Sequence, residues 1–193
     1  MGFSDFAYEE FFAPNFKKIK TYVFPELIIE KDKNFISELF LSFVFFSQYD
    51  KVNRPVAYYI IRRIQQSIET YNEARIGFIE LAEAGENRLK PYINSLNKLE
   101  LLISLLYQIY NLYKPKEGEP KLFESNDGSS YQRLNRCYNQ IKHIDNNPYE
   151  LNQFTFLDVD RFSTSESYVT FIELHDFIQE LVGMANRLLD IKD

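Results

Sequence analysis

The feature that most constrains the fold is a helical repeat of apolar residues in the middle of the chain. Apolar side chains recur there at steps of three and four residues: Ala57, Ile61, Ile64, Ile68, Tyr71, Ala74, Phe78 and Leu81. This spacing places them on one face of a helix, which we predict from about Arg54 to Ala84. Asn53 and Pro55 suit its start, and Gly85 suits its end.

A second long helix is predicted from about Tyr92 to Tyr113. Its apolar residues fall on two faces: Leu99, Leu102, Leu106, Ile109 and Tyr113 on one, and Leu101, Leu105 and Leu112 on the other. A helix that is apolar on two faces is usually buried between other elements. We therefore expect this helix to be central.

The N-terminal part of the chain is divided by prolines, which are poorly tolerated inside helices. Residues 3–24, before Pro25, are predicted to form one or two short helices. Residues 34–49 favour a buried helix, although their Phe and Val content also permits a strand.

Two capping boxes mark the starts of later helices. Ser129 and Gln132 have the required spacing and precede a helix predicted from Tyr131 to Asp145. Thr170 and Glu173 precede an amphipathic C-terminal helix in the same way.

The segments between these helices are shorter and more irregular. Residues 114–130 form a polar loop, and residues 154–159 and 167–170 suggest a minor β-hairpin or an irregular excursion. The predicted fold class is all-α, an antiparallel helical bundle with this small insertion before the C-terminal helix. We expect one compact domain, with residues 1–50 as an N-terminal helical extension and residues 51–193 as the bundle.

Charge and composition exclude several classes of protein. The net charge of −6 argues against a broad, nonspecific nucleic-acid binder. A small basic site is still permitted, because Lys51–Arg63 and Gly128–His143 carry basic residues and no acidic ones. One cysteine excludes an internal disulfide and a cysteine-based zinc site. The longest uncharged runs, 39–49 and 101–113, are too short to span a bilayer, so we expect no membrane contact. We also expect a cytoplasmic protein.

The segment from Arg136 to Asp145 stands out in this acidic chain. On a helical wheel its polar residues share one stripe: Arg136, Asn139, Gln140 and His143, with Gln132 and Arg133 nearby. Its apolar residues form another face: Leu134, Cys137, Tyr138, Ile141 and Ile144. The stripe is either an ordinary solvated helix face or a functional site.

The string RCYNQIKH at residues 136–143 resembles the Arg-x-Tyr-Asn-x-x-Lys-His motif of some bacterial proteins of the HEPN superfamily. The matched residues are Arg136, Tyr138, Asn139, Lys142 and His143. The likeness extends from about Val56 to the C-terminus. Two positions depart from it. Cys137 stands where active members commonly have Asn, Asp or His, and Asp145 stands where toxins paired with a nucleotidyltransferase have Tyr.

This resemblance implies a HEPN-like bundle that cleaves RNA without a metal or cofactor, with the RNA 2′-hydroxyl as nucleophile. Histidine exchanges protons near neutral pH, so His143 would transfer protons. Arg136 would bind the phosphate and stabilise charge on its oxygens. The candidates for binding or orienting RNA are Asn139, Lys142, Gln140 and Arg133.

The spacing also bears on oligomeric state. The Cα atoms of Arg136 and His143 would lie about 10 Å apart along a helix axis. Helical side chains lean toward the N-terminus, so Arg136 leans away from His143. The two side chains of one helix are therefore poorly placed to act on a single phosphate. Two copies of the helix that face each other across a twofold axis would instead bring Arg136 of one chain near His143 of the other. The family uses such a homodimeric composite site.

Three functions remain open. The first is a metal-independent endoribonuclease in stress response or phage defence, with any antitoxin or protein partner unknown. The alternative, which Cys137 and the acidic charge favour, is a non-catalytic HEPN-like module that binds a nucleotide, RNA or a protein partner. The third is a scaffold bundle whose tyrosines, 14 in the chain, serve oligomerisation.

The remaining chemical candidates are expected to be structural. His175 is predicted to be structural or simply exposed, and Cys137 to be a small core residue. The acidic pairs Glu9–Glu10 and Asp158/Asp160 resemble surface charge more than metal ligands.

Overall fold

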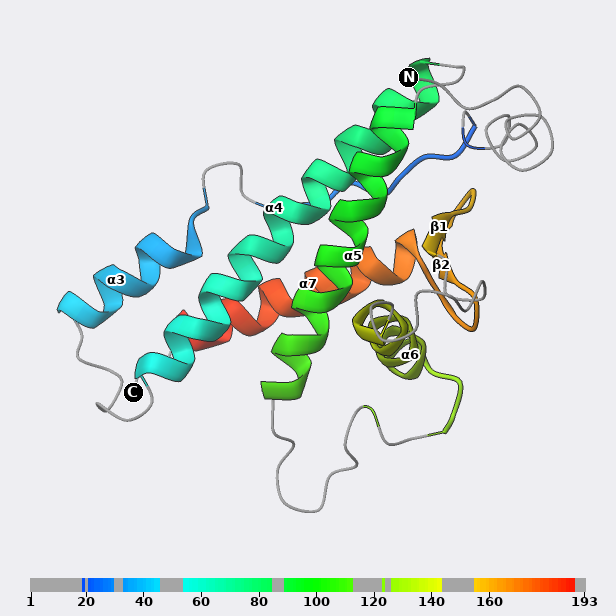
Figure 1. The fold of residues 1–193 in the computed structure, drawn as a ribbon. Helices are drawn as coiled ribbons and strands as arrows, with labels where there is room; N and C mark the ends of the chain where they lie inside the picture. Colours follow the sequence, from blue (N-terminus) through cyan, green and yellow to red (C-terminus); the bar gives the residue numbers. More distant parts are fainter. Residues whose placement is uncertain are drawn as a thin grey trace, which may run out of the picture.

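The computed structural model describes residues 19, 21–29, 33–45, 54–84, 89–112, 123, 126–143 and 155–189. Its elements, in chain order, are α3 (Phe35–Phe45), α4 (Arg54–Ala84), α5 (Leu89–Leu112), α6 (Ser130–His143), β1 (Thr155–Leu157), β2 (Arg161–Thr164), β3 (Tyr168–Thr170) and α7 (Phe171–Leu189). The described chain is mostly helical, as predicted, with a small sheet before the last helix (Figure 1).

The two longest helices, α4 and α5, lie side by side and run antiparallel (Figure 1). The predicted bounds of α4 are confirmed. Helix α5 begins three residues before the predicted Tyr92, at Leu89, because Pro91 lies in its first turn, where proline is tolerated. The two helices approach closely at Gly77, where an added Cβ would lie 2.6 Å from Ser95 Oγ.

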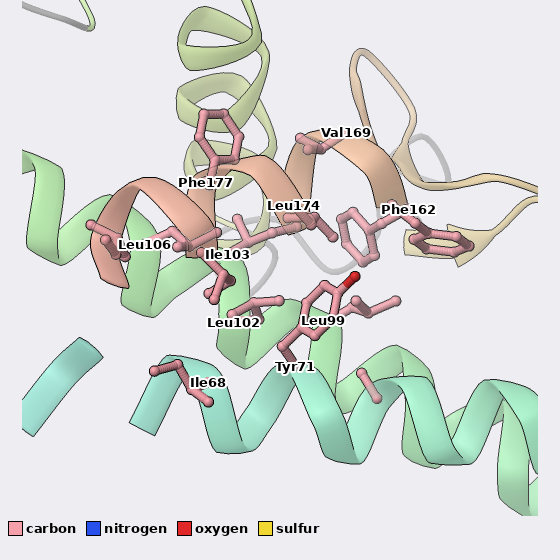
Figure 2. Close-up of a cluster of buried hydrophobic side chains, with 14 of the residues drawn as sticks. Ile68, Tyr71, Leu99, Leu102, Ile103, Leu106, Phe162, Val169, Leu174 and Phe177 are labelled. Carbon is pink, nitrogen blue, oxygen red and sulfur yellow. The ribbon is translucent and has the colours of Figure 1, made fainter. Parts of the chain in front are cut away.

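Helix α5 is central, as predicted, and its side chains fill the space between α4 and the sheet with α7. Figure 2 shows this core. Its labelled residues come from α4 (Ile68, Tyr71), α5 (Leu99, Leu102, Ile103, Leu106), β2 (Phe162), β3 (Val169) and α7 (Leu174, Phe177). The second apolar face of α5 is only partly covered. Leu105 is buried, whereas Leu101 and Leu112 are exposed.

The described residues of the N-terminal region share this core. The ring of Phe24 stacks on that of Phe171, with centroids 4.4 Å apart, and Tyr71 Oη donates a hydrogen bond to the Pro25 carbonyl at 2.9 Å. Phe35–Phe45 forms helix α3, which confirms the prediction of a helix rather than a strand. This helix contacts both α4 and α7. The prediction of helices in residues 3–24 falls almost entirely outside the described residues. Residues 22–24 are described and are not helical.

The predicted hairpin is wrong in its pairing. The sheet has three antiparallel strands in the order β1-β2-β3, so both predicted segments pair with the intervening β2 rather than with each other. Strand β2 has the sequence RFST, in which the polar Ser163 and Thr164 are residue types that are typical of loops. In the fold both are buried, and Phe162 is fully buried between Leu157 and Val169 in register.

The two capping boxes differ in how far they form. At α7 the box is complete, because Thr170 N donates to Glu173 Oε2 at 2.9 Å and Glu173 N donates to Thr170 Oγ1 at 3.2 Å. At α6, Gln132 N donates to Ser129 Oγ at 3.2 Å. The side-chain oxygen Oε1 of Gln132, however, accepts a hydrogen bond from Gly128 N at 2.7 Å, and Gly128 has a φ of 70°.

Helix α6 does not extend the antiparallel pair. It is seen nearly end-on in Figure 1, whereas α4 and α5 run across the view, so α6 crosses them. Its described part ends at His143, and the predicted continuation to Asp145 lies outside the described residues. Within the described ranges, none of the helices combines the length and apolar character that crossing a bilayer requires.

Candidate active site

The inner face of α6 anchors the helix against its neighbours. Leu134 and Cys137 are fully buried, as the helical wheel predicted. The ring of Tyr138 stacks on that of Tyr107 of α5, with centroids 3.8 Å apart and planes at 10°. At the start of the helix, Tyr131 Oη donates to Glu180 Oε2 of α7 at 2.5 Å. Because this face is fixed to α5 and α7, the opposite face has a defined orientation.

The polar stripe of α6 opens onto a surface cavity of about 290 Å³. The residues that line it are Arg136, Asn139, Gln140 and His143 of α6, with Glu166 from the turn between β2 and β3. Four of the predicted site residues are therefore brought together in one chain. Arg136 and His143, which were predicted to focus poorly on a single phosphate from one helix, line the same cavity in one chain.

The β2–β3 turn is held against α6 by side-chain hydrogen bonds. Gln140 Nε2 donates to Ser165 Oγ at 3.1 Å, and Glu166 N donates to Gln140 Oε1 at 3.4 Å. One turn earlier on the helix, Ser167 Oγ donates to the Arg133 carbonyl at 3.3 Å. Gln140 was predicted to orient RNA. In the fold both ends of its amide are bonded to the turn, so it positions Glu166 at the edge of the cavity.

The cationic side of the cavity is accessible to solvent. Arg136, Asn139 and His143 are all exposed. Among the described residues, Arg136 takes part in no ion pair. Asn139 Nδ2 donates to Asn135 Oδ1 at 3.2 Å. An exposed guanidinium beside an imidazole is suited to an anionic ligand such as a phosphodiester.

Arg133 and Lys142 do not join this cavity. Arg133 forms an ion pair with Glu173 and donates to the Gly128 carbonyl. Its guanidinium also lies 5.3 Å from the centre of the Tyr168 ring. Lys142 is exposed in the last turn of α6, but it does not line the cavity.

Of the two other chemically reactive side chains, Cys137 is a buried core residue, as predicted. Burial raises the pKa of the Cys137 thiol to about 11, although hydrogen bonds with Ser167 and Thr164 act in the opposite direction. The thiol is therefore protonated at neutral pH and is a poor nucleophile. His175 is on α7, and its Nδ1 lies 3.0 Å from Asp176 Oδ1.

The predicted surface charge on the sheet is also accounted for. Asp160 pairs with Arg161 at 2.7 Å. Nowhere in the part of the chain that the structure describes do three or more His, Cys, Asp or Glu side chains gather closely enough to hold a metal ion.

Glu166 is the one cavity residue that the sequence did not reveal. It lies in the string STSES, which has the composition of a loop and carries no spacing that relates it to α6. The signal that could have found it is indirect. Recognising RFST as a strand would have made residues 165–167 a tight turn, and short turns between strands project their side chains outward.

Comparisons with family models, with curated proteins and with solved structures find no match to this chain. What the cavity can do must therefore be judged from its own residues.

Proposed function

We propose that this protein is a metal-independent RNA endonuclease of HEPN type that acts as a homodimer. The observation that carries the proposal is that Arg136 and His143 line one exposed cavity. A phosphate-binding cation and a group that exchanges protons near neutral pH are the minimum that such cleavage requires. The proposal includes a cytoplasmic setting and a role in stress response or phage defence.

Each residue has a defined part in this chemistry. Arg136 binds the scissile phosphate, and its guanidinium stabilises the negative charge that develops on the phosphate oxygens. His143 transfers a proton during the displacement of the 5′ oxygen by the 2′-hydroxyl. Asn139 and Lys142 bind or orient the RNA strand beside this pair.

A non-catalytic module that binds a nucleotide, RNA or a protein partner is the second candidate. The buried position of Cys137 favours it. The side chain that follows the motif arginine points into the core, so this chain has no polar group from that position at the cavity.

The test that separates the two is cleavage of RNA in EDTA. Purified protein is incubated with single-stranded RNA, and the 3′ ends of the products are examined for a 2′,3′-cyclic phosphate. We expect cleavage by the wild type and none by His143→Ala. His175→Ala is the matched control, because it removes the other histidine and should leave cleavage intact. Intact RNA at high concentrations of a verified wild-type dimer would instead favour the binding module.

The composite nature of the site can be tested by mixing two inactive variants. If Arg136 of one chain acts with His143 of the other, Arg136→Ala and His143→Ala chains assembled together restore one intact site per heterodimer. Random assembly of a C2 dimer then recovers about a quarter of the wild-type activity. If both residues act within one chain, no heterodimer contains an intact site, and the mixture stays inactive.

A further inference from the structure

The cavity on α6 contains an acidic side chain that the Arg–His motif does not include. Glu166 reaches it from the β2–β3 turn, and Arg136 and His143 reach it from α6. The turn is fixed by the two hydrogen bonds of Gln140, at 3.1 and 3.4 Å. A carboxylate that lines the same cavity as a phosphate-binding arginine opposes the binding of an anion. Its presence there therefore calls for a chemical explanation.

Cleavage of RNA by its own 2′-hydroxyl needs two proton transfers. A base must remove the proton of the 2′-hydroxyl, and an acid must protonate the 5′ oxygen as it leaves. Two different groups can be in the correct protonation states at the same time, which a single imidazole cannot achieve. The cavity is lined by two such groups, the carboxylate of Glu166 and the imidazole of His143, together with Arg136.

We infer that Glu166 is the general base, accepting the proton of the 2′-hydroxyl while the His143 imidazolium protonates the 5′ oxygen. The inference rests on the proposed function. The bond between O2′ and phosphorus forms as the bond between phosphorus and O5′ breaks. The products are a 2′,3′-cyclic phosphate and a 5′-hydroxyl. One proton enters Glu166 and one leaves His143, so charge and atoms balance without an oxidant or a metal.

At about 290 Å³ the cavity is close to the lower limit of the range of roughly 300–1,000 Å³ that is typical of small-molecule sites, so a phosphate and part of a ribose can enter it.

The charged or titratable groups that line the cavity with Glu166 are Arg136 and His143 of α6. On the elements packed around α6, Arg133 is paired with Glu173 of α7, and Arg161 of β2 is paired with Asp160. The ring of Tyr168 on β3 lies against the guanidinium groups of Arg133 and Arg161.

The decisive variant is Glu166→Gln, which keeps the shape of the side chain and removes the base. We expect kcat/KM to fall about 10²- to 10⁴-fold, with KM little changed, because general acid–base catalysis contributes in this range. The acidic limb of the pH profile of kcat/KM should disappear, while the basic limb stays. Glu80→Gln, an exposed glutamate on α4, is the matched control and should leave the profile unchanged.

A second variant guards against a merely structural role. Glu166→Ala removes the carboxylate, and added formate should restore part of the activity if only the base is missing. Circular dichroism checks that both variants fold. RNA with a single 2′-deoxy position at the cleavage site should be bound but not cut there.

The outcomes distinguish this inference from the function on which it rests. If the wild type does not cut RNA, the proposed function fails and the inference falls with it. If the wild type cuts RNA but Glu166→Gln keeps both its rate and its acidic limb, only the role of Glu166 is overturned. The role of Glu166 would also be overturned by a second pair of results. These are that formate does not restore the activity of Glu166→Ala, and that Glu166→Gln keeps the acidic limb of the pH profile.

Discussion

Arg133 and Arg136 lie one turn apart on α6, yet the fold uses them in opposite ways. Arg133 is partly buried, with its guanidinium paired with Glu173, bonded to the Gly128 carbonyl and placed beside the Tyr168 ring. Arg136 is exposed at the cavity and has no ion pair among the described residues. Of these two neighbouring arginines, one is thus held by contacts within the fold, and the other is exposed at the cavity, where the proposed function assigns it to RNA binding.

The difference comes from what packs against each turn of the helix. Strand β3 and the first turn of α7 reach the beginning of α6, and they bring the carboxylate of Glu173 to Arg133. The β2–β3 turn reaches the later part of α6 through Gln140 and leaves a hollow over Arg136. Arg133 faces other elements and is paired by one of them, whereas Arg136 faces a hollow and stays exposed to solvent.

Replacing each arginine in turn should separate these roles most clearly. Arg136→Ala should lower kcat/KM for RNA by about 10²- to 10³-fold, as for loss of one preorganised donor, with the thermal midpoint unchanged. Arg133→Ala should lower the thermal midpoint while the folded protein still cuts RNA. Initial rates and thermal melts of both variants are the measurement. Equal losses of activity in the two variants would show that Arg133 and Arg136 do not have separate roles in stability and in RNA cleavage.

The predictions that succeeded rest on local patterns. The bounds of α4 follow from apolar spacing within one helix, and the cap of α7 joins Thr170 and Glu173, three residues apart. The stripe of α6 follows from its own period. Each of these can be read in a short window of sequence, because the interacting residues are neighbours along the chain.

What the sequence could not reveal depends on contacts between distant residues. The use of Arg133 depends on Glu173, 40 positions later, and the placing of Glu166 depends on the bond between Gln140 and Ser165, 25 positions apart. The wheel placed Arg133 near the stripe of Arg136, as a candidate for binding or orienting RNA, because it describes one helix without its neighbours. Strand β2 was missed for a related reason, since its buried hydroxyl side chains are stabilised only by the sheet.

The inner face of α6 provides a second contrast with the exposed arginine. The pKa of the Cys137 thiol is raised from 9.0 to about 11 by burial, so the folded state holds this proton more tightly than the unfolded state. The associated stability is fully present below pH 9.0 and is lost as the pH rises through about 11. At about 1.4 kcal/mol per unit of pKa, the loss is on the order of 3 kcal/mol at most.

Cys137→Ala isolates this effect from other alkaline titrations. The free energy of unfolding in urea is measured for both proteins between pH 8 and pH 11. The stability advantage of the wild type should shrink as the pH rises, because the variant lacks the thiol. A constant difference across this range would mean that the thiol ionises alike in both states, and that the inner face is less well shielded than its burial indicates.

The pairing of Arg133 with Glu173 should give a smaller effect that tests the structural half of the comparison. Glu173→Gln keeps an oxygen that can accept the hydrogen bond from Thr170 N, so it preserves the cap and removes only the charge. A double-mutant cycle of Arg133→Ala and Glu173→Gln should give a coupling of about 1–2 kcal/mol, within the range for residues in one network. Additive losses would indicate that Arg133 stabilises the fold through Gly128 and Tyr168 alone.

The smallest predicted effect concerns Gln140, which lines the cavity but is bonded to the turn. Gln140→Ala should cost less than about 1 kcal/mol of stability, because its hydrogen bonds are exposed. If the turn positions Glu166 for proton transfer, the variant should lower kcat several-fold and leave KM nearly unchanged. Asn139→Ala is the comparison, since Asn139 lines the same cavity without contacting the turn, and it should raise KM instead. The same kinetic change in both variants would place Gln140 with the RNA-binding residues, and the turn would then have no separate part in the chemistry.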